Sequence, residues 1–213
     1  MVRYKNGDQK KKLIVANSKK LFYQKGFTAV KISEICKLCD IPIGNFSYYF
    51  KKKDDILREV YSDYLVRSFS FVQTNAEKKM SNTLTNICAI MLYYKNIYKD
   101  ENILRFHSEV IKYNSMGFLH NELTRLYWQF GYEFGNNMDE RECSLMTDAD
   151  IGMRRQLYMN FLENGETDVE KLVRDIYTIT GKLFDCPKDV IGEYIDYAVE
   201  FSRQHEDINL RLV

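Results

Sequence analysis

The segment GFTAVKISEICKLCDIPIGNFSYYFKKKDDIL, residues 26–57, contains the pattern that decides the fold. Apolar residues at helical spacing predict two short helices, 32–38 and 42–50, with a tight turn between them. A longer helix is predicted before them over residues 8–25, and Gly26 follows it as glycine commonly follows a helix C-terminus. One helix followed by two shorter ones across a tight turn is typical of a helix-turn-helix.

The second short helix separates its residues into an inner and an outer face. Phe46 and Phe50 lie four positions apart, so both are expected to point into the small core. The outer positions offer groups that suit DNA, because glycine lets a backbone come close, asparagine pairs with base edges, and tyrosine offers a flat ring with a hydroxyl. The predicted outward residues of this helix are Ile43, Gly44, Asn45, Tyr48 and Tyr49.

The charge distribution indicates which part of the chain meets a polyanion. Residues 1–75 contain 15 lysines and arginines against 7 acidic residues, whereas residues 76–213 contain 16 against 23. The basic part is therefore expected to contact phosphates and the acidic part is not. Lys31 and Lys53 are predicted phosphate contacts, and the alternative for the run Lys51–Lys53 is a solvated helix end.

The whole chain is predicted to be all-α. Only 2 prolines and 10 glycines occur among 213 residues, which favours long helices over a multi-turn β architecture. We expect an N-terminal three-helix domain, residues 1–52, followed by a larger helical domain, residues 53–213. The further helices are predicted over residues 54–74, 80–98, 101–114, 118–137, 146–163, 167–184 and 188–204.

Several other classes of protein find little support. The longest apolar run, residues 87–94, is too short to span a bilayer, and the N-terminus has no signal-peptide pattern. The five cysteines are an odd number, as expected of reduced thiols in a cytoplasmic protein. Cys36 and Cys39 have metal-site spacing, but no second pair completes four ligands, so core packing is predicted. We expect no metal, no cofactor and no catalytic role.

Residues 10–60 resemble the DNA-binding signature of TetR-type transcriptional regulators. The matching positions are Gly26, Phe27, Ile35, Ile41, Gly44, Phe46, Phe50 and Lys53. This resemblance implies a homodimer that places one recognition helix of each subunit in the major groove of an operator in double-stranded DNA. It also implies a repressor that leaves the operator when a small-molecule effector binds the C-terminal domain.

Some positions depart from that signature and leave an alternative open. They are Lys31, Asp40, Pro42, Ser47 and Tyr49. Aspartate tolerates the left-handed conformation better than most residues, so the turn at Asp40 is expected to form. The alternative function is a helical ligand-binding or protein-interaction module that no longer reads DNA; an enzyme on a helical scaffold is a weaker alternative.

The C-terminal part is rich in aromatic residues and yields two further predictions. An effector site is predicted near residues 101–137, where the candidate contacts are Phe106, His107, Tyr113, Tyr127 and Trp128; the alternative for each ring is ordinary core packing. Apolar stripes on the last two helices predict the dimer face, and their alternative is packing within one subunit. The stripes comprise Val169, Leu172, Val173, Ile176, Ile179 and Leu183, with Val190, Ile191, Tyr194, Ile195, Ala198 and Phe201.

Overall fold

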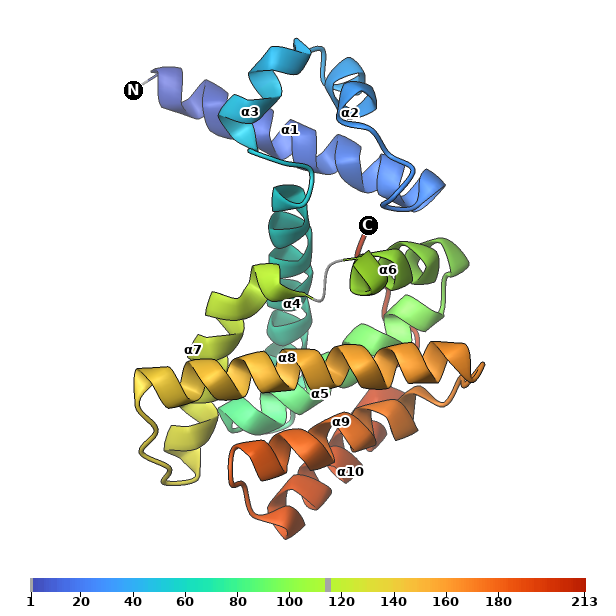
Figure 1. Ribbon diagram of the computed structural model, residues 1–213. Coiled ribbons are helices and arrows are strands. Elements are labelled where there is room, and N and C mark those ends of the chain that lie inside the picture. Colours follow the sequence, from blue (N-terminus) through green and yellow to red (C-terminus); the bar gives the residue numbers. More distant parts are fainter. Residues whose placement is uncertain (1, 114–115) are drawn as a thin grey trace.

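The computed structural model describes residues 2–113 and 116–213, and the side chains from residue 7 onward within these ranges (Figure 1). All regular structure in these residues is helical, which confirms the predicted fold class. The elements are α1 (Val2–Lys25), α2 (Ile32–Leu38), the 3-10 turn η1 (Ile43–Asn45), α3 (Phe46–Tyr49), α4 (Asp55–Asn75), α5 (Asn82–Tyr98), α6 (Glu101–Tyr113), the 3-10 turn η2 (Gly117–Leu119), α7 (His120–Glu133), α8 (Glu140–Glu163), α9 (Val169–Leu183) and α10 (Lys188–Gln204).

The molecule has two parts, which Figure 1 shows one above the other. The N-terminal unit comprises α1, α2, η1 and α3, and the C-terminal bundle comprises α4 to α10. Helix α4 leaves the N-terminal unit and runs down into the bundle, where it packs against α5. Helix α6 lies at the top of the bundle and packs against α1. The N-terminal unit is therefore attached to the bundle through α4 and α6.

The predicted helix 42–50 is broken into two shorter pieces. A 3-10 turn covers Ile43–Asn45 and one α-helical turn covers Phe46–Tyr49, after which Phe50 is extended. Pro42 precedes the turn and its carbonyl accepts a 2.9 Å hydrogen bond from the backbone N–H of Asn45. Helices this short are not stable by themselves. Phe46 and Phe50 are both buried, as predicted, and their ring centroids lie 6.0 Å apart.

Two helix starts differ from their predictions, and a capping box explains one of them. Helix α8 begins at Glu140 rather than at residue 146, because Asp139 and Glu142 form a reciprocal capping box. The Asp139 carboxylate accepts from the backbone N–H of Glu142 at 2.8 Å, and Glu142 accepts from that of Asp139 at 3.1 Å. Helix α1 begins at Val2 instead of residue 8. The predicted end at residue 114 lies outside the described residues.

Asp40 forms the turn between α2 and η1 in the left-handed conformation, with φ of 50°. The N–H of Ile41 donates to the carbonyl of Cys36 at 3.1 Å, which completes the hydrogen-bond pattern of a Schellman motif. Glycine is the usual residue at this position, and the turn that the sequence predicts therefore forms on an aspartate. Asp185, after α9, repeats the arrangement with φ of 48°, and Cys186 donates to Gly181 at 2.8 Å.

The apolar stripes of the last two helices are used inside the subunit. Helix α10 packs against both α5 and α9, and α9 packs against α5 and α8. Val173, Ile176 and Ala198 have no accessible surface, and most other members of the stripes are buried. The expectation that these stripes form the dimer face is therefore wrong, because the single chain already covers them.

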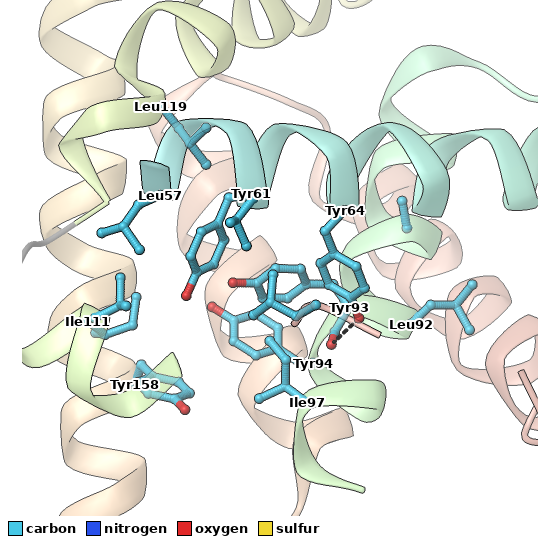
Figure 2. Close-up of a cluster of buried hydrophobic side chains, with 14 of the residues drawn as sticks. Leu57, Tyr61, Tyr64, Leu92, Tyr93, Tyr94, Ile97, Ile111, Leu119 and Tyr158 are labelled. Carbon is cyan, nitrogen blue, oxygen red and sulfur yellow. Dashed lines mark hydrogen bonds between the residues drawn. The ribbon is translucent and has the colours of Figure 1, made fainter. Parts of the chain in front are cut away.

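A cluster of tyrosines forms the centre of the bundle where α4, α5, α6 and α8 meet. Figure 2 shows Tyr61, Tyr64, Tyr93, Tyr94 and Tyr158 with their rings close together and the Tyr64 hydroxyl bonded to the carbonyl of Tyr93, at 3.3 Å. All five are buried. Buried hydroxyls need hydrogen-bond partners, and the same ring nitrogen of one histidine lies within hydrogen-bond distance of two of them.

That histidine is His107, which is fully buried. Its Nδ1 lies 2.9 Å from the Tyr61 hydroxyl and 3.3 Å from the Tyr93 hydroxyl, whereas its Nε2 has no hydrogen-bond partner among the described residues. Burial lowers the pKa of His107 from 6.5 to about 3, because the site has no water to solvate an imidazolium. The folded protein therefore holds this ring neutral.

Neutral His107 makes stability depend on pH. Between pH 7 and pH 5 the unfolded chain protonates His107 and the folded chain does not, so the free energy of unfolding falls as pH falls. The loss attributable to this group is about 2 kcal/mol by pH 5. Urea unfolding at pH 7 and pH 5 measures this. Between the two pH values, the free energy of unfolding of His107→Gln should fall by about this much less than that of wild type. Ile97→Val, a core control, should keep the full decrease, and equal slopes in wild type and His107→Gln would contradict the assignment.

The left-handed backbone at Asp40 gives a second prediction. Asp40→Ala should lower the free energy of unfolding by about 1 kcal/mol, because alanine lacks the local hydrogen bonding that lets aspartate occupy this region. Asp40→Gly removes the same charge without that steric cost, and should be clearly more stable than the alanine variant. The measurement is urea unfolding of both variants at one pH. Identical stabilities would show that the turn does not constrain this residue.

Candidate nucleic-acid interface

The outer side of η1 and α3 presents an uncovered face to solvent. Ile43 is 62% exposed and Tyr48 is 81% exposed, and Gly44 and Asn45 are also exposed. A Cβ built on Gly44 would meet no atom of this chain within 4 Å. Phe46 and Phe50 fix the opposite side in the core, so this face is held outward by the packing beneath it.

Tyr49 differs from the other predicted outward residues. It is only half-buried, and its ring packs edge-to-face on Tyr48 with centroids 5.0 Å apart. Such a pair restrains both rings. Tyr49 therefore holds the Tyr48 ring in place on the exposed face. Tyr49 itself lies at the edge of that face. We name the exposed set Ile43, Gly44, Asn45 and Tyr48 the reading face.

Exposed lysines stand on both sides of the reading face along the sequence. Lys51 and Lys52 follow it directly and are exposed; Lys52 lies 3.9 Å from Asp54 in a loose ion pair. Lys31 is exposed at the start of α2, where Glu34 accepts a hydrogen bond from its backbone N–H at 2.9 Å. Lys37, which the sequence interpretation did not select, is exposed near the end of α2. The polar side of that short helix is where the sequence could have indicated Lys37 as a further phosphate contact.

Lys53 points inward instead of lying beside the reading face. Its Nζ donates to the carbonyls of Phe27 and Val30 at 2.7 and 2.8 Å, and lies 4.2 Å from the centroid of the Phe27 ring. Burial lowers the pKa of this ammonium, and the carboxylates of Asp54 and Glu109 oppose that shift. Lys53 thus ties the start of α4 to the loop before α2, and its predicted phosphate contact has only the remaining N–H available.

Helix α6 holds the N-terminal unit through one carboxylate. Glu109 Oε2 accepts from the backbone N–H of Thr28 at 2.7 Å and from its hydroxyl at 2.8 Å. Gly26 lies against the same carboxylate: a Cβ there would come within 3.0 Å of it, and the φ of 79° already favours glycine. The loop after α1 therefore has its geometry fixed by a side chain of the bundle.

Arginine and aromatic contacts complete this joint. The Nη2 of Arg105 donates to the carbonyls of Tyr23 and Gln24, both at 3.0 Å, at the C-terminal end of α1. Phe106 stacks on Phe22 with ring centroids 5.3 Å apart. The contacts of Arg105, Phe106 and Glu109 thus join α6 to the N-terminal unit, and we name these three residues the α6 joint.

A second connection runs along α4. Lys11 on α1 forms a 2.5 Å ion pair with Glu59, and Lys19 forms a longer one of 3.5 Å with Asp63. These four side chains are partly exposed, so each pair stabilises the junction only modestly. The shorter pair keeps α1 and the first turns of α4 in register.

An apolar cavity of about 80 Å³ lies in the bundle below the α6 joint. Helices α4, α5, α6, α7, α8 and α9 and the turn η2 all contribute to its wall. The lining residues are Leu65, Phe69, Asn86, Ile90, Tyr93, Tyr94, Ile111, Met116, Leu119, Leu123, Leu126, Tyr127, Ile151, Arg154, Arg155, Tyr158 and Tyr177. Most are aliphatic or aromatic, and two are arginines.

The predicted effector contacts are dispersed by the structure. Tyr127 lines the cavity, and His107 lies directly behind its wall with its ring 4.9 Å from that of Tyr158. Phe106 belongs to the α6 joint. Tyr113 is exposed and packs on Phe27, and Trp128 is 45% exposed on α7; neither lines the cavity. The spacing of apolar residues along a helix cannot predict which aromatic ring lines a cavity, which packs at the α6 joint and which is exposed.

The two arginines of the wall have different partners. Arg155 donates from Nε to the carbonyl of Ile111 at 3.2 Å and from Nη2 to that of Lys112, so it caps the end of α6. Arg154 pairs with Asp150, from Nε to Oδ2 at 2.5 Å, and Asp150 is fully buried. The sequence interpretation missed both, although Asp150 and Arg154 stand four apart on the apolar side of a predicted helix.

Comparison with known proteins identifies the N-terminal segment. Residues 14–60 match the family model described as bacterial regulatory proteins, tetR family. YuxN, an uncharacterized HTH-type transcriptional regulator of Bacillus subtilis (strain 168), is 29% identical over 96 residues. That match covers 45% of this chain and 33% of YuxN, so the chain spans about a third of this relative's length.

Two solved structures share the fold over most of both chains. RolR, solved without ligand, is 15% identical, covers 86% of this chain and 95% of its own, and has a TM-score of 0.57. Full-length native TylP, a tetR regulator from Streptomyces fradiae, is 15% identical, covers 93% of each chain, and has a TM-score of 0.53. At this identity the likeness concerns the fold alone.

The family match covers the segment that carries the reading face, and the shared fold extends through the bundle. Residues 14–60 of this chain are thus similar to the tetR family of bacterial regulatory proteins.

Proposed function

We propose that this protein is a DNA-binding transcriptional regulator. The reading face carries the proposal: its four residues are exposed, their one ring contact within the described chain is that of Tyr48 with Tyr49, and exposed lysines stand before and after them in the sequence. Ile43 offers an apolar contact for a thymine methyl group, and Asn45 and Tyr48 offer hydrogen-bonding groups for base edges and phosphates. The tetR family match over residues 14–60 supports this assignment.

The proposed division of labour follows the two parts of the fold. Residues 1–52 act as the DNA-binding domain and residues 53–213 as the effector-binding and dimerisation domain. Lys31, Lys37, Lys51 and Lys52 position the protein through phosphates, while the reading face enters the major groove. All five cysteines are free thiols, which fits action in the cytoplasm, where DNA is found. Within the described residues no helix is both long and apolar enough to cross a membrane.

Repression relieved by a small molecule is the proposed mode of regulation. The cavity and the α6 joint share α6, because Ile111 lines the cavity one turn after Phe106 and His107. A ligand that prefers a displaced α6 would move Arg105 and Glu109, and with them the N-terminal unit. It can shift the equilibrium only as far as it binds that state more tightly.

A homodimer is proposed because helix-turn-helix proteins meet two half-sites about one helical turn, ~34–36 Å, apart. With the stripes of α9 and α10 buried, another face must supply the contact. Leu145, Ala149, Gly152 and Met153 lie at helical spacing on one side of α8, and the first three are exposed. Helix α8 crosses the front of the bundle in Figure 1. We propose this side of α8 as the dimer contact.

DNA binding is tested with duplexes selected from a random library and with the duplex upstream of the gene. Wild type should bind preferred duplexes tightly and lose affinity steeply as salt rises. The variant Asn45→Ala with Tyr48→Ala should bind them at least tenfold more weakly, because it removes two groups that contact bases. Fluorescence anisotropy at two salt concentrations measures both effects.

Tyr132→Ala is the matched control, since Tyr132 on α7 is 84% exposed and far from the reading face in sequence. It should bind as wild type does. If no duplex is preferred and the double variant is unchanged, the chain is instead a helical ligand-binding or protein-interaction module, which is the competing function.

The dimer contact is tested by adding charge to α8. Ala149→Arg should convert a dimer into a monomer of about half the mass, because an arginine would have to be desolvated at the centre of the contact. Light scattering after size-exclusion chromatography gives the mass. Val66→Arg changes an exposed residue on α4 and should leave the dimer intact. A dimeric Ala149→Arg protein would place the contact elsewhere.

A further inference from the structure

The cavity wall holds two arginines in a largely apolar setting: Arg155 donates to the carbonyls of Ile111 and Lys112 at the end of α6, whereas Arg154 has buried side-chain partners on α8 and α9. Arg154 lines the cavity, among walls formed largely by leucine, isoleucine and tyrosine side chains. A buried guanidinium is costly unless its N–H groups have acceptors. The partners of Arg154 therefore determine what a ligand can contribute.

Buried groups already satisfy one side of Arg154. Nε donates to Asp150 at 2.5 Å, Nη2 donates to the hydroxyl of Thr180 at 3.1 Å, and the guanidinium lies 4.9 Å from the centroid of the Tyr177 ring. Asp150 also accepts from Thr180 at 2.6 Å and from the hydroxyl of Tyr127. This network fixes the guanidinium and balances its charge with one carboxylate.

The other side of Arg154 opens to the cavity. About 15% of its side chain remains accessible, and it is a lining residue. A guanidinium has five N–H groups; Asp150 and Thr180 take one each, and the Tyr177 hydroxyl is a further hydrogen-bond partner. Most of the cavity wall is aliphatic, as at Ile151, Leu123 and Leu126, and its side-chain acceptors are limited to Asn86 and the tyrosine hydroxyls. An Arg154 N–H that these groups leave without an acceptor favours a ligand that brings an oxygen acceptor.

We propose that the cavity binds a small, largely apolar molecule with an oxygen acceptor at one end, a carboxylate or a carbonyl, held by Arg154. The volume of about 80 Å³ limits the ligand to about the size of one ring, since drug-sized pockets are ~300–1,000 Å³. Tyr94 and Tyr158, stacked at 5.9 Å, provide ring faces on the wall for its apolar part. Asp150 makes the anchor neutral as a pair, so a carbonyl can serve as well as a carboxylate.

The effect of this ligand on DNA binding rests on the proposed function, whereas the binding of the ligand does not. The ligand would lie between Arg154 on α8 and Ile111 on α6. Helix α6 carries the α6 joint, so filling the cavity acts on the helix that holds the N-terminal unit. Binding itself can be measured without DNA.

Three probes of one shape separate the chemistry: 4-methylbenzoate, 4-methylbenzamide and p-xylene. Titration calorimetry on the full chain should give dissociation constants at least tenfold lower for one or both acceptor probes than for p-xylene, because only they pair with Arg154. The benzoate and the benzamide distinguish a carboxylate ligand from a carbonyl ligand. Equal binding of all three probes, or binding of p-xylene alone, would overturn the proposal, as would no binding.

Two variants locate the contact. Arg154→Met with Asp150→Asn removes both charges together, so that neither is left unpaired, and should abolish the preference for acceptor probes. Leu123→Trp fills the cavity from α7 while leaving Arg154 and Asp150 in place, and should abolish binding of every probe. If Leu123→Trp still binds the benzoate or the benzamide, the binding site lies elsewhere. If the double variant does not fold, Leu123→Trp alone tests whether the probes bind in the cavity.

The DNA assay separates this inference from the proposed function. Tight duplex binding without a preference for acceptor probes refutes the ligand class and leaves the regulator intact. Acceptor binding through Arg154 in a chain that prefers no duplex refutes the regulator and leaves the ligand class intact.

Discussion

The carboxylate of Glu109 is the contact by which the bundle fixes the loop after α1 in the N-terminal unit. It accepts two hydrogen bonds from Thr28, and it occupies the space beside Gly26 that any other side chain would need. Charge-assisted hydrogen bonds of this kind are short and directional. Arg105 works from the same helix on the end of α1. The orientation of the reading face relative to the bundle therefore depends on where α6 lies.

The interior below this joint uses tyrosine where many proteins use leucine. Each buried tyrosine adds apolar area and also a hydroxyl that must be paired. Asp150 and Asn86 accept from the hydroxyls of Tyr127 and Tyr177, and His107 shares a hydrogen bond with that of Tyr61. A core paired in this way has fewer alternative packings than an aliphatic one, since moving one ring breaks a hydrogen bond elsewhere. Such a core suits a bundle in which small displacements have to be passed between helices.

Much of the fold could be predicted from the sequence because apolar spacing records which side of a helix is buried. The positions of Phe46 and Phe50 are the clearest case: both rings are inside. Spacing cannot reveal what covers an apolar stripe, so α9 and α10 were assigned to a partner although α5 covers them within the chain. It also cannot place a polar side chain that reaches across the fold. Lys53 bonds to carbonyls 26 and 23 residues away, and Glu109 bonds to Thr28 at a separation of 81.

The shortness of η1 and α3 has a consequence for how the protein could change over time. Their backbone is held by Phe46 and Phe50, while Gly44 and Tyr48 make almost no contact that the fold requires. Surface positions of this kind accept most substitutions at little cost in stability. Mutations on the reading face are thus separated from mutations that threaten folding. Changes to this exposed surface can be sampled one residue at a time, on a scaffold that stays folded throughout.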